Sequence, residues 1–441
     1  MNQPHPDGQP CLAKSTAIKL LSSSYGLSAT VESLPGYHDQ NFRVQTDSGE
    51  QFVLKISNPR EDPDLLDLQT DALNFLAGRE VSFKVPLTIP TKDGESRFSY
   101  SENETPTWVR LLSYLKGDVL AGVQPKTAPL LESLGQCLGQ LDVELSGFEH
   151  AAPRRREFLW DLSRANYLIE EHLGHLTDHG RRAMVENIRV EFESTVVPFL
   201  DELPRSIIHN DANDYNVLVS DPSPQGRTVI GLLDFADISE SPTICELAIA
   251  AAYGIMGTAN PVAMILALVR GYNEVRPLTE LELEVLFPLI RARLGVSVSL
   301  SASHSRTENR DPYLSISEMP AWSALDHLSA IHPRLARNLF RDVCGMEPCP
   351  RHQEVKAWIK AHKSEMGPLV LPSLDNALVF DLSPASPEID DLDEVLDVPL
   401  FSTRIFRRME EAGADVGVGR YGEPRLWYTS AGYAKNGGDF P

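Results

Sequence analysis

Three polar residues with a fixed spacing constrain this sequence more than any other feature. His209, Asp211 and Asn216 lie in the stretch HNDANDYN, as H-x-D-x-x-x-x-N, and apolar residues flank the stretch on both sides. Asp and Asn residues crowded between strand-like segments predict either an Asx-rich turn or a functional site. The stretch alone does not separate the two, because Asp and Asn also favour turns.

Two further residues extend the pattern along the chain. Lys55 lies within the strand-like segment FVLKIS, and Asp234 ends the apolar run GLLD after HNDANDYN. Alone, such a lysine is often a surface charge, and such an aspartate is often a turn former. Together the set matches what phosphoryl transfer from a nucleotide needs. A lysine neutralises phosphates, one aspartate takes the acceptor proton, and an asparagine and a second aspartate hold Mg²⁺. The order therefore indicates a kinase.

Residues 28–114 predict an antiparallel sheet with one helix. The segment TVESLPGYHDQNFRVQTDSGEQFVLKIS alternates in period two, and PGYHD and TDSGE supply turns between strands. Apolar residues at helical spacing follow, with Pro63 near the start of the predicted helix and Gly78 at its end. The segment RFSYSENETPTWVRLLSYLKG then predicts two more strands.

The remaining segments differ in hydrophobic pattern and in charge. Residues 115–365 are mostly helical in pattern, interrupted by HNDANDYN and by the strand before Asp234. Residues 1–27 are expected to form a polar segment and a short helix. Residues 366–441 are expected to form an acidic linker and a C-terminal extension, because DLSPASPEIDDLDEVLD carries acids and no base. The sequence thus predicts an α+β protein with a small sheet domain and a larger helical one.

Composition narrows the class of partner. The chain carries 62 Asp and Glu against 40 Lys and Arg, a net charge of −22, so we expect neither nucleic acid nor a membrane as a partner. The five cysteines form no CxxC pair, which favours reduced thiols over a zinc site or a full disulfide framework. The N-terminus lacks a signal pattern, and LAIAAAYGIMG is too short to span a membrane. We expect a soluble, cytoplasmic protein.

The motifs resemble those of the aminoglycoside phosphotransferase family, the small-molecule branch of the protein-kinase-like fold. LPGYHDQNFRV, HNDANDYNVLV and IGLLDFADISESPTICELAIAAAYGIM resemble the hydroxylysine kinase group most closely. The resemblance covers about residues 20–345. It implies a bilobal fold, with nucleotide binding in a small antiparallel-sheet N-lobe that holds one helix. A large, mostly helical C-lobe would carry catalysis and substrate binding.

The resemblance also implies roles for single residues. Asp211 would be the catalytic aspartate, and Asn216 and Asp234 would bind Mg²⁺. Residues 35–41 would cover the phosphates of ATP or GTP, and residues 110–114 would form the hinge that meets the base through backbone groups. The residues implied for nucleotide binding are Lys55, Gln69, Gly36, Tyr37, His38, Gln40, Asn41, Arg110, Leu112 and Tyr114.

Two departures from the family pattern affect nucleotide binding. Residues 35–41 hold a single glycine, Gly36, so the polar side chains of His38, Gln40 and Asn41 are expected to assist the backbone. The helix partner of the lysine is usually a glutamate in such folds. Here Gln69 is the best-placed residue, with Asp71 as an alternative, and a glutamine would hold Lys55 by a hydrogen bond.

The resemblance suggests an amino alcohol as the phosphate acceptor. Its ammonium group would need carboxylates or aromatic faces. A carboxylate-bearing acceptor such as 5-hydroxylysine would also need a cation, for which Arg291 and Arg293 are candidates, whereas ethanolamine would not. The choice between these acceptors stays open, and Asp237 and Glu246 are equally explained as helix N-terminal acids. The candidate acceptor residues are Asp214, Asp237, Glu246, Tyr253 and Arg293.

Two segments are similar to bacterial proteins in which such a kinase is fused to further domains. ENRDPYLSISEMPAW is similar to a segment of these relatives, and VGRYGEPRLWYTSAGYA resembles the start of their peptidase-like portion. Their third domain has the fold of a pyridoxal-phosphate aminotransferase and can act as a phospholyase. We therefore expect a kinase fused to or acting with such an enzyme, or alternatively an ordinary C-terminal extension. Two other hypotheses are an antibiotic kinase and a nucleotide-binding pseudokinase that regulates a partner enzyme.

Overall fold

A computed structural model describes residues 10–36, 38–102, 105–152, 160–304, 318–329, 331, 333–346, 380–381 and 427–428. Tyr37, most of ENRDPYLSISEMPAW and nearly all of the 366–441 segment lie outside the described residues. The chain groups into two compact units, described separately below. Unit 1 comprises Met1–Gln124, Gln140–Phe158 and Arg205–Ser241, and unit 2 comprises Pro125–Gly139, Leu159–Pro204 and Pro242–Pro441.

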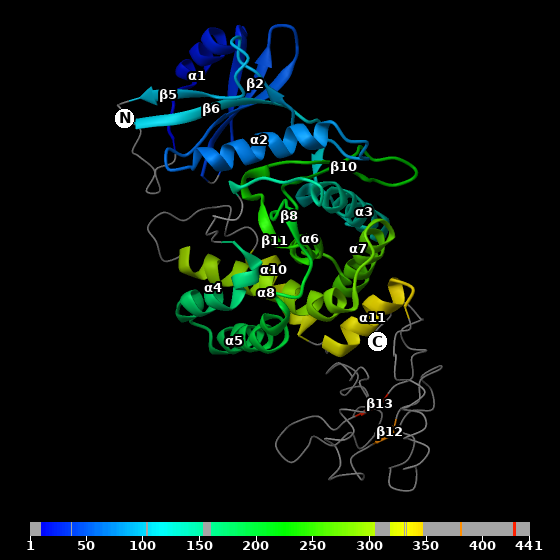
Figure 1. The fold of residues 1–441 in the computed structure, drawn as a ribbon. Helices are drawn as coiled ribbons and strands as arrows, with labels where there is room; N and C mark the ends of the chain where they lie inside the picture. The colour runs from blue at the N-terminus through cyan, green and yellow to red at the C-terminus, as the bar shows by residue number, and fades with distance from the viewer. Residues whose placement is uncertain are drawn as a thin grey trace. The chain divides into compact units, whose positions relative to one another are not determined.

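The main sheet of unit 1 is antiparallel, as predicted (Figure 1). Its strand order is β1-β2-β3-β6-β4, and β5 pairs with β6. The register sets Lys55 of β3 between Asn41 of β2 and Arg110 of β6, so three polar residues stand side by side across the sheet. Its strands are β1 (Ala29–Leu34), β2 (Gln40–Thr46), β3 (Gln51–Ile56), β4 (Thr88–Ile89), β5 (Phe98–Glu102) and β6 (Thr105–Ser113).

Helices complete this layer. A hydrophobic core that includes Leu21, Phe42 and Leu54 joins the N-terminal helices to the sheet. These are α1 (Lys14–Leu20) and the π-helical η1 (Leu21–Tyr25). Helix α2 (Pro63–Ala77) begins after an N-cap in which the Asp62 carboxylate accepts from the Asp64 amide, and it ends at Gly78. Both ends of α2 confirm the start and stop signals, Pro63 and Gly78, that the sequence predicted.

The rest of unit 1 consists of short strands that carry the motif residues. HNDANDYN connects β8 to β9, and Asp234 lies two residues after the end of β10. Strands β10, β9 and β7 form one small sheet, and β11 pairs with β8. The bounds are β7 (Asp118–Val119), η2 (Leu120–Gly122), β8 (Arg205–Ile208), β9 (Val217–Val219), β10 (Val229–Leu232), η7 (Phe235–Asp237) and β11 (Ser239–Pro242).

Unit 2 is helical and is built around α8 (Glu280–His304). Helices α4, α5, α6, α10 and α11 all pack against α8. This helix is long and apolar enough to span a membrane, but 83% of its most apolar window is buried inside the structure, as in a core helix. The other bounds are α3 (Ala128–Leu145), η4 (Leu162–Arg164), α4 (Ala165–His172), η5 (Leu173–His175), α5 (His179–Thr195), η6 (Val197–Phe199), α6 (Ile244–Gly254), α7 (Pro261–Val275), α10 (Glu318–Leu328), α11 (Pro333–Val343), β12 (Phe380–Asp381) and β13 (Trp427–Tyr428).

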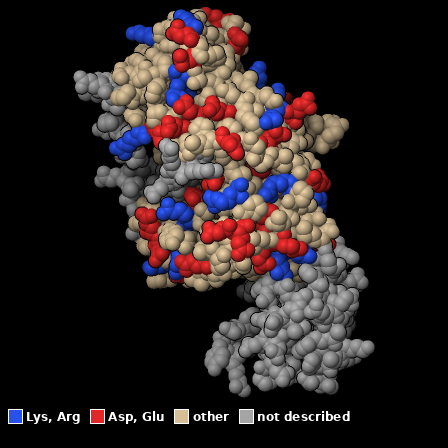
Figure 2. Space-filling view, viewed as in Figure 1, with Lys and Arg blue, Asp and Glu red and all other residues tan. Residues whose placement is uncertain are grey.

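The combination of an antiparallel sheet with a helical remainder confirms the predicted α+β class. The domain boundaries placed after residues 27, 114 and 365 stay predictions. Acidic and basic side chains are interspersed over the face shown in Figure 2, so the net charge of −22 is not gathered into one acidic tract there.

Candidate active site

His209 connects the two polar motifs of unit 1. Its side chain is fully buried after β8, and its Nδ1 atom accepts a hydrogen bond of 3.3 Å from the Asp211 amide. Nε2 therefore carries the proton and donates to the Leu233 carbonyl at 2.8 Å. The imidazole ring also packs edge-on against the Phe235 ring, with 4.5 Å between the ring centroids. One imidazole thus ties the backbone at Asp211 to the backbone just before Asp234.

The protonation of His209 should make stability depend on pH. Burial lowers the pKa of His209 from the ordinary 6.5, although the Leu233 carbonyl and the Asp234 charge oppose the shift. The unfolded state then binds more protons just below pH 6.5, so the stabilisation is complete above that pH and is lost as the pH falls through the folded-state pKa. We expect the free energy of unfolding to fall on acidification, by at most about 1.4 kcal/mol per pH unit from this residue.

Urea unfolding at several pH values between about 5 and 7.5 measures this slope. His209→Gln should reduce the slope, because glutamine does not titrate yet offers one donor and one acceptor. The control is His179→Gln, at the exposed first residue of α5. Equal slopes in His209→Gln and the unmodified protein would contradict the assignment.

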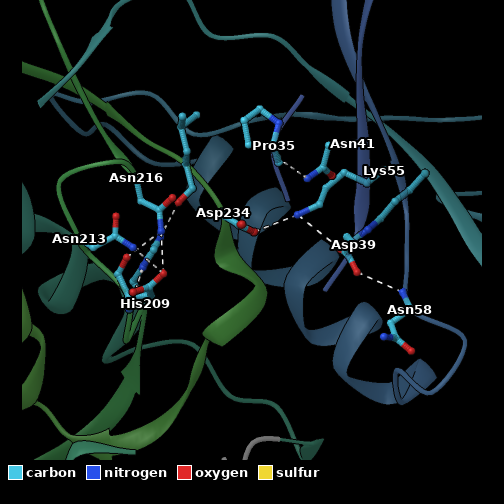
Figure 3. A network of polar contacts seen from close by, with 12 residues as sticks. Pro35, Asp39, Asn41, Lys55, Asn58, His209, Asn213, Asn216 and Asp234 are labelled. Atoms are coloured by element: carbon cyan, nitrogen blue, oxygen red, sulfur yellow. Dashed lines mark hydrogen bonds and ion pairs between the residues drawn. The ribbon is translucent and has the colours of Figure 1, made fainter. Parts of the chain in front are cut away.

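The Asp211 carboxylate is held by two amides. Asn213 Nδ2 and Asn216 Nδ2 both donate to Asp211 Oδ2, at 2.9 and 2.8 Å (Figure 3). Asn216 Nδ2 also donates to the Asp211 carbonyl at 2.9 Å, which turns the other amide atom of Asn216, Oδ1, away from Asp211. The arrangement fixes one carboxylate oxygen and orients an amide oxygen as a possible ligand.

Asn213 organises this loop, and the sequence did not reveal that role. Its Oδ1 accepts from the Tyr215 amide at 2.8 Å, and its carbonyl accepts from the Asn216 amide at 3.0 Å. The side chain is therefore the centre of an Asx turn that also reaches Asp211. The only sequence signal was the concentration of Asn residues in HNDANDYN, which does not say which of them faces the aspartate.

Backbone strain is concentrated at the same place. Asn210 (φ 66°) and Asp234 (φ 53°) are the non-glycine residues with positive φ in the described chain. Positive φ is uncommon outside glycine and is tolerated best by Asn and Asp. The Asn210 side chain donates to Ser239 Oγ at 3.0 Å, which helps to hold its conformation. Strain of this kind often marks functional sites.

Lys55 is shared between two carboxylates. Its Nζ lies 2.9 Å from Asp234 Oδ1 and 3.6 Å from Asp39 Oδ2. Burial opposes the charged lysine, but the two carboxylates outweigh burial and raise the pKa of Lys55. Partial removal from water likewise disfavours charge on Asp234, whose side chain is 45% exposed, but Lys55 outweighs this and lowers the pKa of Asp234. Both groups are charged at neutral pH.

Gln69 and Gln40, both predicted for nucleotide binding, differ in their contacts from the expectation. Gln69 is buried on α2, and within the described residues no hydrogen bond joins it to Lys55. Ion pairs with Asp39 and Asp234 hold the lysine instead, because a carboxylate binds an ammonium more strongly than a neutral amide does. Both ends of the Gln40 amide bind the Leu12 backbone, at 2.7 and 3.0 Å, so Gln40 fixes the N-terminal segment.

Four of the other predicted nucleotide residues are placed by the main sheet: Asn41 and Arg110 pair with Lys55, and Leu112 and Tyr114 lie in or just after β6. The Arg110 side chain is almost fully buried, whereas His38 is exposed. Leu112 pairs with Val53 across the sheet, and the Tyr114 amide donates to Gln51 at 3.2 Å, just beyond β6.

The predicted acceptor residues are divided between the units. In unit 1, Asp214 lies within HNDANDYN and Asp237 is the last residue of η7; the Asp214 carbonyl accepts from the Ala121 amide at 2.8 Å. In unit 2, Arg293 Nη2 donates to the Tyr253 hydroxyl at 3.2 Å. Glu246 lies fully buried in the first turn of α6.

The guanidinium group of Arg293 lies between two aromatic rings. Its Cζ is 4.9 Å from the Trp160 ring centroid and 5.3 Å from that of Tyr253. The sequence analysis did not identify Trp160. The alternative cation, Arg291, forms an ion pair with Glu191.

Asn216 and Asp234 fit a magnesium ion. Both offer oxygen atoms, which Mg²⁺ prefers, and the lowered pKa of Asp234 keeps its carboxylate charged. The Leu233 amide donates to the Asn216 carbonyl at 2.8 Å, which brings the backbone just before Asp234 to Asn216, and Figure 3 shows the dashed contact between Asp234 and Lys55. Among the described residues, no group of three or more His, Cys, Asp and Glu is placed to hold a metal. Two oxygen donors match an ion that is shared with nucleotide phosphates, as Mg²⁺ commonly is.

A strand lysine paired with an aspartate, a second aspartate fixed by amides and an Asn–Asp oxygen pair define a phosphotransferase of the protein-kinase-like type. The chain belongs to the phosphotransferase enzyme family, whose sequence pattern matches residues 30–279. The hydroxylysine kinase of Mus musculus is 31% identical over 350 residues, covering 74% of this chain and 92% of that protein. The homoserine kinase of Agrobacterium fabrum is 28% identical, covering 58% of this chain and 73% of that protein.

Solved structures show the same fold. A microcompartment-associated aminopropanol kinase aligns with a TM-score of 0.54 at 16% identity, covering 75% of this chain and 98% of that one. An amicoumacin kinase in complex with AMP-PNP and Ca²⁺ aligns with a TM-score of 0.52 at 13% identity, covering 72% and 94%. The family, the kinase-like fold and the class of enzyme, a phosphotransferase that acts on a hydroxyl group, are thus confirmed.

Proposed function

We propose that this enzyme transfers the γ-phosphate of ATP or GTP, bound with Mg²⁺, to the hydroxyl group of an amino alcohol of the ethanolamine or 5-hydroxylysine class. The observation that carries the proposal is the charged pair of Lys55 and Asp234 beside the amide-held Asp211. The similarity to hydroxylysine kinases over most of the chain supports the class of acceptor.

Asp211 performs the proton chemistry in this proposal. The acceptor hydroxyl oxygen attacks the γ-phosphorus, the bond to the β-phosphate oxygen breaks, and the nucleoside diphosphate leaves. The hydroxyl proton passes to the Asp211 carboxylate. Because Asn213 and Asn216 fix Oδ2, the carboxylate is oriented before the acceptor arrives, which lowers the cost of positioning.

The nucleotide is held by residues of unit 1. Lys55 neutralises charge on the α- and β-phosphates, and Asn216 and Asp234 hold the cation, which neutralises charge that develops on the transferred phosphoryl group. Residues 35–41 cover the phosphates chiefly through their backbone, since Gln40 is bound to Leu12. Residues 110–114 meet the base through backbone groups.

The acceptor residues proposed for unit 2 favour a substrate that bears a carboxylate. Arg293 is 3% exposed and supplies a cation framed by aromatic rings. 5-Hydroxylysine carries both a carboxylate and ammonium groups, whereas ethanolamine carries only an ammonium. Asp214, Asp237 and Glu246 are the acids proposed for the ammonium.

The metabolic setting belongs to the same proposal. An O-phosphorylated amino alcohol is the class of compound from which a pyridoxal-phosphate-dependent phospholyase eliminates phosphate. The resemblance of VGRYGEPRLWYTSAGYA to fused relatives supports action beside, or fusion to, such an enzyme. The proposed location is the cytoplasm.

A coupled assay of nucleoside diphosphate release tests the proposal. The acceptors are ethanolamine, choline, 5-hydroxylysine, homoserine and kanamycin, each with ATP and with GTP. We expect kcat/KM for ethanolamine or 5-hydroxylysine to exceed that for kanamycin by at least about a hundredfold, because a missing polar contact in a matched site is costly. Arg293→Met should lower kcat/KM for 5-hydroxylysine about tenfold or more and leave ethanolamine within about threefold.

Each contrary outcome of this assay identifies a different function. Preference for kanamycin would indicate an antibiotic kinase. Nucleotide binding without transfer to any of the five acceptors would indicate a pseudokinase module. An Arg293→Met enzyme unchanged toward 5-hydroxylysine would remove Arg293 from the acceptor site.

A further inference from the structure

Asp39 lies in the loop between β1 and β2 and connects three parts of unit 1. Its Oδ2 atom lies 3.6 Å from Lys55 Nζ and 3.9 Å from Arg110 Nη2. Its Oδ1 atom accepts a hydrogen bond of 3.1 Å from the Asn58 amide, in the turn that follows β3 (Figure 3). The side chain is only 13% exposed, so these contacts form with little competition from water.

The loop around Asp39 leaves its backbone little freedom. A Cβ atom added to Gly36 would come within 2.3 Å of the Asp39 carbonyl and 2.6 Å of Asn41 Nδ2. Asn41 Nδ2 in turn donates to the Pro35 carbonyl at 3.2 Å, which closes the loop upon itself. The close packing of this loop therefore restrains the backbone of Asp39, and the ionic partners restrain its carboxylate.

Asp39 is the second carboxylate within ion-pair distance of Lys55, and it also approaches Arg110. Two cations, Lys55 and Arg110, face two carboxylates, Asp39 and Asp234. If Asp234 binds a cation, its attraction for Lys55 weakens, because the cation neutralises part of the negative charge that attracts the ammonium. A second carboxylate would then keep the buried ammonium in place, and no hydrogen bond joins Gln69 to Lys55 within the described residues.

We propose that Asp39 is the positioning residue for Lys55, holding the ammonium in the site when Asp234 turns from the lysine to the cation. Arg110 and the Asn58 amide keep the Asp39 carboxylate in place for this task. The inference rests on the proposed function, since it assumes that Lys55 serves the nucleotide and Asp234 the metal.

The test measures how the binding of a fluorescent nucleotide depends on Mg²⁺. The probes are mant-ADP and mant-GDP, titrated at a series of Mg²⁺ concentrations with no acceptor present. In Asp39→Asn, Asp234 is the one carboxylate partner left to Lys55 among the described residues, so Mg²⁺ must compete with the lysine for Asp234. We expect the Mg²⁺ concentration for half-maximal binding to rise about tenfold, as for the loss of one coupled contact.

Two variants control for charge and for shape. Asp47→Asn makes the same change at an exposed acid in the turn after β2, and it should stay within about twofold of the unmodified protein. Asp39→Glu keeps the charge and should stay within about threefold. If Asp39→Asn does not fold, Asp39→Asn with Arg110→Met removes both members of the buried pair and is titrated in its place.

The possible results are distinguishable. An Asp39→Asn protein within about twofold of the unmodified one overturns the inference. So does a variant that binds nucleotide more weakly by the same factor at every Mg²⁺ concentration, because that result describes a purely structural residue. If the unmodified protein shows no Mg²⁺-dependent binding of either probe, the proposed function fails instead.

Discussion

Replacing Asp211 by asparagine should lower kcat by about 10²–10⁴-fold and leave nucleotide affinity within about threefold. Asparagine has nearly the shape of aspartate, and its amide oxygen can still accept from Asn213 and Asn216, so the loop should persist. What disappears is the group that takes the proton of the acceptor hydroxyl. Initial rates with the preferred acceptor, together with mant-nucleotide titrations, separate the two effects.

The control for Asp211→Asn is Asp221→Asn, which removes one charge from an exposed position just after β9. Its kcat should stay within about twofold of the unmodified enzyme, as for most surface substitutions. An Asp211→Asn enzyme as fast as the unmodified one would refute a base at this position. A loss that appeared equally in nucleotide binding would assign Asp211 to the nucleotide.

Replacing Asp234 by asparagine should lower kcat/KM for the nucleotide by at least about 10³-fold. The change removes the carboxylate proposed for the cation and also the partner 2.9 Å from Lys55. Asparagine tolerates the positive φ of 53° at this position, so the backbone should keep its conformation. The rate should respond to added Mg²⁺ only at far higher concentrations than in the unmodified enzyme.

Thermal unfolding distinguishes this effect from misfolding. Asp234→Asn should unfold cooperatively, since Asp39 still neutralises Lys55, whereas Asp234→Ala adds strain because alanine disfavours positive φ. Asp221→Asn again supplies the control for charge. A folded Asp234→Asn enzyme within about tenfold of normal kcat/KM would show that Asp234 does not hold the cation.

The elements that local chemistry dictates could be predicted from the sequence. Helix α2 begins after Asp62 and ends at Gly78, because an N-cap side chain, a proline and a terminal glycine act through neighbouring backbone atoms. The alternation in the segment before Lys55 likewise predicted strand β2, whose burial alternates from residue to residue, because period-two burial is a property of each strand alone. The order of the motif residues then sufficed to indicate the family, which the comparisons confirm.

The partners of particular side chains could not be predicted in the same way. Gln40 binds Leu12, and Lys55 binds Asp39, through approaches that only the folded chain creates. Asn213 could not be told apart from its neighbours, because composition shows a polar cluster and not the direction of each amide. The proposed roles of the nucleotide and acceptor residues stay predictions for the same reason, since they depend on a ligand whose position the sequence does not encode.

The positive φ angles at Asn210 and Asp234 limit how this site can be reused. A side chain can be copied into another scaffold by substitution, but a left-handed backbone at the right point after a strand cannot. Transplanting only Lys55, Asp211, Asn216 and Asp234 would therefore deliver the right groups in the wrong directions. A transplanted site would need the backbone at both strand ends together with His209, which joins them.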